Sequence, residues 1–425
     1  MEQHVKHYCG IFGTYGTPEA AHNTVLGLHA LQHRGEESCG ITTGDGKHIH
    51  THKGMGQVSD VFADASDIAR LTGHLAIGHN RYSTTGSDNI VNAQPFVAEC
   101  RDGSIAVAHN GNLTNTADLR SSMQETGAIF QTTTDSELIL HLIARSPEPE
   151  ISNRVADALK QIQGAYSLVF ATENKLIAAR DPHGFRPLCL GQLGDAWVVA
   201  SESCALDIIS ARYIRDIEPG ELVVIDENGL RTHTFASVEK KAFCIFEYIY
   251  FSRPDSLIFG DNVDKTRRSL GKQLAKEHPA DADIVIAVPD SSNTAAMGYA
   301  EASGIKHEIG LIRNHYVGRT FITPGQGNRG AKVRLKFNPV RGVLNGKRVV
   351  VIEDSIVRGT TLRHLVRMIR DAGALEVHVR ISCPPIVAPC FYGIDFQTTK
   401  ELIAGESTVE EIREHLGVDS LGYLS

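Results

Sequence analysis

A cysteine near the start of the chain heads the first group of residues that could do chemistry. Cys9 opens the run Cys-Gly-Ile-Phe-Gly, whose apolar residues read as the start of a strand. A thiolate attacks an amide well, but a free thiol is mostly protonated at pH 7 and needs a base beside it. A lone cysteine in such a place is more often a small buried residue. The residues that follow must decide between a nucleophile and a core position.

Three polar clusters lie downstream of Cys9, each where an apolar element begins or ends. They are His-Asn-Arg-Tyr-Ser-Thr at 79–84, His-Asn-Gly-Asn-Leu at 109–113 and Thr-Asp-Ser-Glu at 134–137. The clusters supply an arginine, an Asn-Gly pair of donors and a carboxylate. Thr134 or Asp135 is also a natural N-cap for the apolar helix that starts at Leu138. Because sites are built at the ends of elements, these clusters favour a nucleophilic Cys9.

A second reactive group lies at residues 353–361. It follows residues 349–352, four β-favouring apolar residues that predict a strand buried on both faces. Glu353 and Asp354 end this strand, and a loop of small and hydroxyl residues leads into a helix at 361–371. Backbone N–H groups at a helix start favour a phosphate, while adjacent carboxylates suit ribose hydroxyls and Mg²⁺. This stretch predicts a site for a phosphorylated sugar.

Strands and helices alternate through the second half, which predicts a parallel, doubly wound α/β sheet. The expected elements are strands at 284–288, 307–312, 349–352 and 377–382 and helices at 295–302 and 361–371. Ligands of such sheets bind beyond the C-terminal ends of the strands, where residues 289–292 and 353–361 lie. Turns and short strands at 218–232 come before this region, so we place a domain boundary near residue 235.

Composition narrows the class of protein. The 425 residues allow two or three domains, and a net charge of −8 argues against a general nucleic-acid-binding protein. No apolar run reaches the roughly 18 residues that span a bilayer, and the first eight residues lack the apolar core of a signal peptide. Eight scattered cysteines do not suggest a disulfide framework. We therefore expect a cytoplasmic protein that binds neither membranes nor nucleic acid.

The first half resembles the class II glutamine amidotransferases, glutaminases with an N-terminal nucleophile (Ntn hydrolases). Five motifs carry the resemblance in the family's order: the three clusters above, residues 9–13, and Leu-Gln-His-Arg-Gly at 31–35. The resemblance implies a four-layer αββα domain at 9–235. It also implies that Asn110 and the Gly111 N–H stabilise an oxyanion, while Arg81 and Asp135 hold the α-carboxylate and α-amine of glutamine.

Residues 1–8 stand in front of the proposed nucleophile. Their removal would free the α-amine of Cys9, whose reference pKa is about 8, to act as the adjacent base. Nothing else in the sequence needs this leader. We therefore expect residues 1–8 to be a propeptide that is cleaved.

The second half, residues 236–425, resembles the type I phosphoribosyltransferases, and nearly the whole chain resembles the amidophosphoribosyltransferase family. The motifs are the loop at 353–361 and the segments at 246–256 and 316–322. The family converts 5-phosphoribosyl 1-pyrophosphate (PRPP) and glutamine to 5-phosphoribosylamine, glutamate and pyrophosphate, opening de novo purine synthesis. The resemblance implies that PRPP is held by Glu353, Asp354, Ser355, Arg358, Gly359, Thr360, Thr361 and Arg319.

The resemblance also implies cofactors and partners. Mg²⁺ would be bound by Glu353 and Asp354 with Ser292 beside them. Purine nucleotides would act as feedback inhibitors, and the chain would form a dimer or tetramer. Some members carry a [4Fe–4S] cluster on four cysteines, and Cys244 and Cys390 match two of these. Two thiolates cannot complete the site, so a cluster is expected only if a C-x-x-C pair lies beyond Ser425.

Two alternatives remain open. Another glutaminase-fused aminotransferase would share the first half alone, and the loop at 353–361 speaks against it. A regulatory PRPP-binding paralogue would not need Cys9, Arg81 or Asn110, all of which are present. The basic stretch from Arg319 to Arg341 also has two interpretations. It is either a solvated loop or a lid over pyrophosphate.

Overall fold

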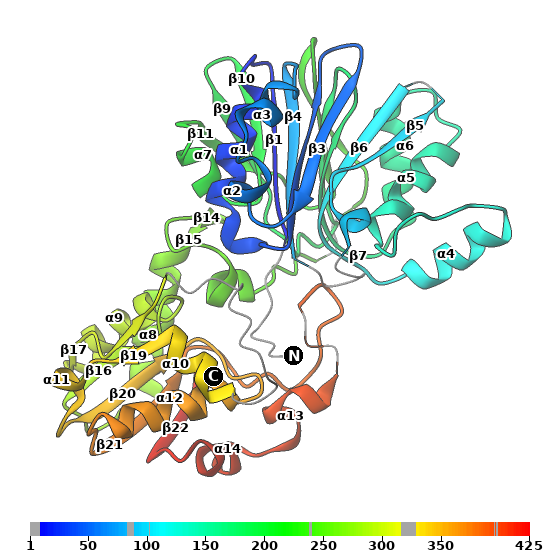
Figure 1. Ribbon diagram of the computed structural model, residues 1–425. Coiled ribbons are helices and arrows are strands. Elements are labelled where there is room, and N and C mark those ends of the chain that lie inside the picture. The colour runs from blue at the N-terminus through cyan, green and yellow to red at the C-terminus, as the bar shows by residue number, and fades with distance from the viewer. Residues whose placement is uncertain are drawn as a thin grey trace.

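The computed structural model describes residues 9–82, 89–101, 103–237, 240–315, 329–394, 396 and 398–425. Figure 1 shows two units, with the first half of the chain above and the second half below. Within the described ranges, no helix combines the length and the apolar character needed to cross a membrane.

Two antiparallel sheets form the upper unit. The first has the order β11-β9-β10-β1-β4-β2-β3 and the second the order β13-β12-β8-β7-β6-β5. The strands of the first sheet are β1 (Gly10–Tyr15), β2 (Ser38–Gly44), β3 (Ile49–Met55), β4 (Leu75–Arg81), β9 (Cys189–Leu193), β10 (Ala196–Ala200) and β11 (Arg212–Asp216). Those of the second are β5 (Phe96–Cys100), β6 (Gly103–Leu113), β7 (Gly164–Ala171), β8 (Leu176–Arg180), β12 (Glu221–Asp226) and β13 (Gly229–Thr234).

Helices cover the outer face of each sheet. The longer ones are α1 (Ala20–Ala30), α4 (Thr116–Glu125), α5 (Ser136–Arg145) and α6 (Ile151–Leu159), and the short ones are η1 (Gln32–Arg34), α2 (Val58–Val61), α3 (Ala65–Ala69), η2 (Ile90–Asn92) and α7 (Cys204–Asp207). Strand β1 shows why four layers result. Ile11 points into the core between the sheets, while Phe12 packs outward with Leu28 of α1. On the second sheet, Leu138 and Val155 bring α5 and α6 onto the outer face.

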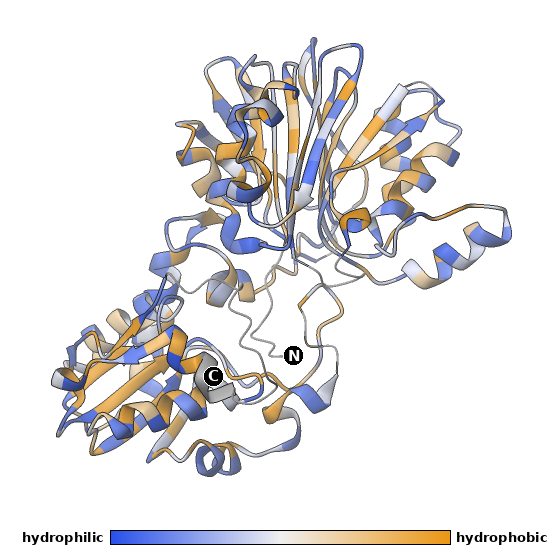
Figure 2. Ribbon diagram, viewed as in Figure 1, coloured by the Kyte–Doolittle hydropathy of each residue, from blue (hydrophilic) through white to orange (hydrophobic). Residues whose placement is uncertain are grey.

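This αββα arrangement confirms the fold expected for the first half. Successive side chains of a strand point to opposite faces, so a strand covered on both sides must be apolar on both. Most strands of the upper unit accordingly carry orange, hydrophobic residues in Figure 2, whereas the edge strand β3 is largely blue.

The lower unit is built on a five-stranded parallel sheet, which confirms the expected doubly wound fold. Its order is β17-β16-β20-β21-β22. The strands are β16 (Ile284–Ala287), β17 (Lys306–His307), β20 (Arg348–Glu353), β21 (Glu376–Ile381) and β22 (Ser420–Tyr423). The helices are α8 (Val263–Glu277), α9 (Asn293–Ser303), α10 (Arg329–Lys336), α11 (Arg341–Leu344), α12 (Thr360–Asp371), η4 (Thr399–Glu401), α13 (Ile403–Glu406) and α14 (Val409–Leu416).

The central strand β20 is buried on both faces, as its sequence predicts. Val349 and Val351 pack with Leu365 of α12, whereas Val350 and Ile352 pack in a separate cluster with α8 and α9. All four residues of the run have no exposed surface.

The strand expected at 307–312 does not exist as one strand. Residues 306–307 form β17 of the parallel sheet, and Leu311–Arg313 form β18, which pairs with β19 (Phe337–Pro339) in a separate ribbon. Between them the Val340 N–H donates to the Gly310 carbonyl at 2.9 Å, which draws the chain away from β16. The new partner lies about thirty residues later, and the apolar pattern could not indicate it.

Residues 240–262 lie between the two units. They contain a π-helix, η3 (Glu247–Phe251), and the hairpin of β14 (Leu257–Ile258) and β15 (Asp261–Asn262), which Figure 1 places beside the junction. The last strand of the upper unit, β13, ends at Thr234, and α8 begins the covering of the parallel sheet. We retain 9–235 and 236–425 as proposed domains.

Candidate active sites

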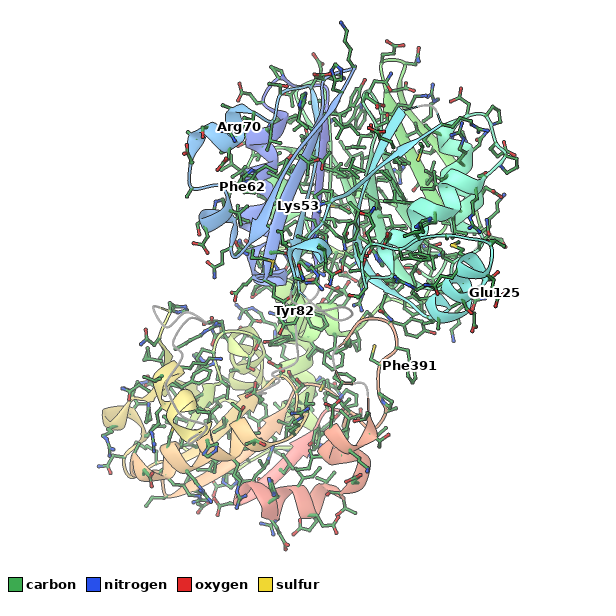
Figure 3. All side chains as sticks on the ribbon, turned by 45° about the vertical axis from the view of Figure 1, so that its right-hand side comes forward. Lys53, Phe62, Arg70, Tyr82, Glu125 and Phe391 are labelled. Atoms are coloured by element: carbon green, nitrogen blue, oxygen red, sulfur yellow. The ribbon has the colours of Figure 1, made fainter. Side chains whose placement is uncertain are left out.

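Cys9 stands directly before β1, at the edge where the upper unit faces the lower one. Its Sγ donates to the Tyr82 carbonyl at 3.6 Å, and Tyr82 lies at the junction of the units in Figure 3. Burial raises the pKa of the Cys9 thiol to about 11, although the nearby Arg81 lowers it. A thiol in this state needs a base to become a nucleophile. The leader at 1–8, whose cleavage would supply one, lies outside the described residues.

Strand β6 brings Asn110 and Gly111 to the same region. The Asn110 side chain has no exposed surface, and neither its oxygen nor its nitrogen has a hydrogen-bond partner within the described ranges. Leaving a buried amide unpaired costs about 1–3 kcal/mol, so this group indicates a place for a ligand. Gly111 has φ +151°, and an added Cβ would stand 1.9 Å from the Ala165 carbonyl oxygen. Only glycine fits there.

Asp135 is buried next to β6 and carries a negative charge. Leu113 N–H donates to its Oδ2 at 2.9 Å, Ser136 Oγ donates to its Oδ1 at 3.2 Å, and His109 Nδ1 lies 3.5 Å away. Burial raises the pKa of Asp135, but His109 and the hydrogen bonds outweigh burial and hold it below its usual value. Asp135 occupies the N-cap position of α5, yet its side chain makes no capping bond. Its two oxygens instead face Leu113, Ser136 and His109.

Arg81 ends β4, with 3% of its side chain exposed. Its Nη1 lies 3.5 Å from Glu37 Oε2. The charges of Arg81 and Asp135 both act on the Cys9 thiol, so the structure brings these three predicted residues together. Two neighbours were not singled out from the sequence, namely Glu37 and His109. His109 was within reach of sequence reasoning, because it belongs to the same motif as Asn110.

The acid pair lies at the C-terminal end of β20, in the lower unit. Ser292 Oγ donates to Glu353 Oε1 at 3.2 Å, and Ser291 Oγ donates to Asp354 Oδ2 at 2.5 Å. Burial and the neighbouring Asp354 raise the pKa of Glu353 well above its ordinary range. Burial also raises the pKa of Asp354, partly offset by Ser291, Ser355 and Arg267. Two buried carboxylates side by side disfavour each other's ionisation, and a cation would relieve this.

The loop after the acids opens helix α12. Gly359 has φ +72° at the N-cap position, and Thr360 and Thr361 form the first turn. Ser355 Oγ donates to Asp354, so this hydroxyl is shared with the acid pair. Arg358 Nη2 donates to Glu401 Oε1 at 2.5 Å, which ties the loop to the C-terminal residues. Arg319 and most of the expected lid, residues 316–328, lie outside the described residues.

In the described ranges, no group of three or more His, Cys, Asp or Glu side chains is arranged to hold a metal ion. Cys244 and Cys390 both pack around Phe251 and Phe396. Burial raises the pKa of Cys244, and Glu247 and then Cys390 raise it further. They supply two of the four thiolates that a [4Fe–4S] cluster needs.

Fold and sites together define a class: an Ntn-type glutamine amidotransferase unit fused to a phosphoribosyltransferase unit. A family model described as a glutamine amidotransferase domain matches residues 79–207. Amidophosphoribosyltransferase of Bacillus subtilis is 50% identical over 418 residues, which cover 98% of this chain and 88% of the relative. Amidophosphoribosyltransferase 2, chloroplastic, of Arabidopsis thaliana is 53% identical over 419 residues, covering 98% and 74%.

A solved structure agrees. Glutamine PRPP amidotransferase from B. subtilis, complexed with ADP and GMP, superposes with a TM-score of 0.94 at 50% identity, covering 98% of this chain and 91% of that one. The chain therefore belongs to the amidophosphoribosyltransferase family. It is an enzyme, a pentosyltransferase with glutamine amidotransferase activity.

Proposed function

We propose that this chain hydrolyses glutamine at Cys9 and uses the ammonia to displace pyrophosphate from PRPP, the first step of de novo purine synthesis. The buried, unpartnered amide of Asn110 carries the first half of the proposal, because Asn110 follows His109, which lies 3.5 Å from Asp135, and Asp135 acts on the Cys9 thiol. A binding protein without a glutaminase reaction would have no use for such a donor. This observation also disfavours the regulatory paralogue.

The glutaminase steps follow from the proposed roles. Cys9 Sγ attacks the amide carbon of glutamine while its proton passes to the α-amine, once residues 1–8 are removed. Asn110 Nδ2 and the Gly111 N–H donate to the oxygen that becomes negative. The C–N bond then breaks, ammonia leaves with the proton, and water hydrolyses the thioester to glutamate. Arg81 and Asp135 hold the ends of glutamine that do not react.

The transferase site is proposed at the C-terminal edge of the parallel sheet. The loop at 355–361 and the start of α12 would bind the 5-phosphate, with Arg358, Gly359, Thr360 and Thr361 as its donors. Glu353 and Asp354 would accept from the ribose hydroxyls. Ammonia then attacks C1 as the bond to pyrophosphate breaks. Arg319 is proposed to contact the pyrophosphate from the lid.

Mg²⁺ suits the donor set at this place. Glu353 and Asp354 are two hard oxygen donors, and burial raises the pKa values of both. We propose that these carboxylates, with Ser292 beside them, hold the ion, which when bound would balance the charge of the pyrophosphate. An iron–sulfur cluster is proposed only if a C-x-x-C pair lies beyond Ser425, because Cys244 and Cys390 supply two of its four ligands.

Two further proposals concern nucleotide binding, and the cellular location and oligomeric state of the protein. The B. subtilis relative was solved as a complex with ADP and GMP, and we extend purine-nucleotide binding to this chain. We also propose a cytoplasmic homo-oligomer, a dimer or tetramer.

One assay tests the central proposal. Full-length protein is incubated with glutamine and Mg²⁺, with and without PRPP, and glutamate and pyrophosphate are measured together. We expect glutamate and pyrophosphate in equal amounts. They should form only when PRPP is present, or much faster with it. Glutamate without pyrophosphate would favour another glutaminase-fused enzyme. PRPP binding without either product would favour the regulatory paralogue. Intact-mass analysis of the active protein checks that residues 1–8 are absent.

A further inference from the structure

A fully buried guanidinium joins the nucleophile's backbone to the second half of the chain. Arg34, the last residue of η1, donates through Nε to the Cys9 carbonyl at 3.2 Å. Its Nη1 and Nη2 donate to Glu247 at 3.0 and 2.8 Å, and Nη1 also donates to Glu202 at 2.5 Å. The side chains of Arg34, Glu202 and Glu247 have no exposed surface.

The two glutamates come from different halves. Glu202 follows β10 in the upper unit, whereas Glu247 begins the π-helix η3, beyond the proposed boundary at residue 235. Glu247 is 213 positions from Arg34 in the sequence. The planar fork of an arginine matches a carboxylate with two parallel bonds, so this pairing fixes direction as well as distance.

Both glutamates are themselves held in place. Ser252 Oγ donates to Glu247 Oε2 at 2.8 Å, and Arg186 Nη1 lies 3.6 Å from Glu247 Oε1. Glu202 accepts from the Arg253 N–H at 2.9 Å and from Ser256 Oγ at 2.7 Å. Arg34 and Arg186 thus face two glutamates, and the hydrogen bonds of Arg34 and of both carboxylates are made, which is the arrangement that a dry interior tolerates.

The lower unit also holds the π-helix η3 in place. Arg267 of α8 donates to the carbonyls of Tyr248 and Ser252, at 2.5 and 2.9 Å. The same arginine interacts electrostatically with Asp354 of the acid pair. Residues 247–252 therefore stand between Arg34, which contacts Cys9, and Arg267, which faces the proposed PRPP site. π-Helical turns of this kind are rare and are concentrated at functional sites.

The Cys9 carbonyl is the group whose fixing matters most for the proposed chemistry. The α-amine and the thiol both branch from Cα, and once residues 1–8 are gone the residue has no preceding peptide to hold it. Fixing the carbonyl fixes rotation about the Cα–C bond, and with it the positions of the α-nitrogen and of Cβ, which carries the thiol. Arg34 is not among the charges that shift the Cys9 thiol, so it would act through geometry.

We infer that Arg34 is a positioning residue for Cys9 and that Glu247, from the phosphoribosyltransferase half, is its anchor. The glutaminase site is thus not self-contained in residues 9–235. This rests on the proposed role of Cys9 as nucleophile. A displacement of reacting groups by about 1 Å can cost on the order of 100-fold in rate, which sets the expected size of the effect.

The test uses Arg34→Lys, Glu247→Gln and the double variant in the full-length protein. Lysine keeps the charge but loses the fork, and glutamine keeps the shape but loses the charge. We expect kcat for glutamate release to fall roughly 30- to 100-fold, with KM for glutamine changed by less than about 3-fold. PRPP-dependent use of free ammonia stays within about 2-fold. Because both changes break one contact, the double variant should be no worse than the poorer single variant.

Arg180→Lys is the matched control. Arg180 is equally buried in the upper unit, but among the described residues its guanidinium donates to the carbonyls of Gly184, Arg186 and Ile217 and not to a carboxylate. It should lower thermal stability without the selective loss of glutaminase kcat. An equal loss in Arg180→Lys would overturn the inference, as would a Glu247→Gln enzyme with wild-type glutaminase kcat or a parallel loss of the ammonia reaction.

A milder change covers the case in which Arg34 or Glu247 variants do not fold. Ser252→Ala removes one donor to Glu247 and leaves its charge pairing intact. It should lower glutaminase kcat about 3- to 10-fold at unchanged KM, and an unaltered kcat would count against the anchor. If wild-type protein releases no glutamate, the proposed function is wrong. If it does and the variants match it, only the positioning role is wrong.

Discussion

The Ser292 hydroxyl donates to Oε1 of Glu353 at 3.2 Å, joining the start of α9 to the end of β20. Ser292 follows β16 and Glu353 ends β20, two neighbouring parallel strands whose C-terminal ends meet at one edge of the sheet. A hydroxyl next to a buried carboxyl partly replaces the solvation that burial removes. It does not replace the charge of a cation, and the pKa of Glu353 stays raised.

The first prediction concerns pH. A carboxyl whose pKa is raised by folding stabilises the protein while it is protonated, and this stabilisation is lost as the pH rises through the raised pKa. For Glu353 the window begins at its ordinary pKa of 4.5 and extends upward. Without Mg²⁺ and PRPP, Glu353→Gln should therefore raise Tm at pH 7 by about 2–4 °C. The gain should vanish near pH 4, while transferase activity is lost at every pH.

Thermal unfolding of the variant and of wild type, scanned from pH 4 to 8, checks this. Glu125→Gln, at the exposed end of α4 (Figure 3), is the control and should leave Tm unchanged across the range. A variant that is less stable than wild type at pH 7 would show that the Glu353 carboxylate is already neutralised in the free protein.

A second prediction separates the two reactions. Cys9→Ala should abolish glutamine-dependent formation of 5-phosphoribosylamine but keep PRPP-dependent use of ammonia within about 3-fold of wild type, because only the thiol nucleophile is removed. Pyrophosphate release with glutamine or with an ammonium salt measures both. Loss of both activities in a folded protein would contradict the two-site proposal.

A third prediction tests the oxyanion role of Asn110. Removing one such donor typically lowers kcat by 10²–10³, and Asn110→Ala should lower glutaminase kcat by about that factor with little change in KM. Asn112→Ala is the matched control two positions along the strand. Its Nδ2 donates to the Phe391 carbonyl at 2.8 Å, so it contacts the C-terminal half rather than the cluster at Cys9. If both variants lose kcat equally, Asn110 has no special role.

The fourth prediction concerns Gly111. A Cβ there would meet the Ala165 carbonyl at 1.9 Å on a backbone with φ +151°. Gly111→Ala should destabilise the protein by roughly 1–3 kcal/mol or more and disable the glutaminase site, since β6 must move from β7 to relieve the overlap. Chemical denaturation measures the first effect. Gly342→Ala, where nothing lies within 4 Å, should leave stability nearly unchanged.

In the second half, the sequence predicts the central strand of the parallel sheet closely and the edge strand poorly. Residues 349–352 form an unbroken β-branched and apolar run, a pattern typical of a strand covered on both faces. The segment at 307–312 carries a weaker version of that pattern. Its division between β17 and β18 depends on a hydrogen bond between Val340 and Gly310, a contact that no local pattern encodes.

The candidate sites also have features that the sequence predicts and features that it does not. The sequence by itself determined which residue types are present, because Cys9, Asn110 and the acid pair each stand in a distinctive local motif. The tertiary structure alone decided what surrounds them. The sequence suggested Asp135 as a helix cap, but its side chain contacts Leu113 and His109. Arg34 binds Glu247, which is 213 positions away in the sequence. Such contacts are set by how the layers pack, and burial then determines their charges and pKa values.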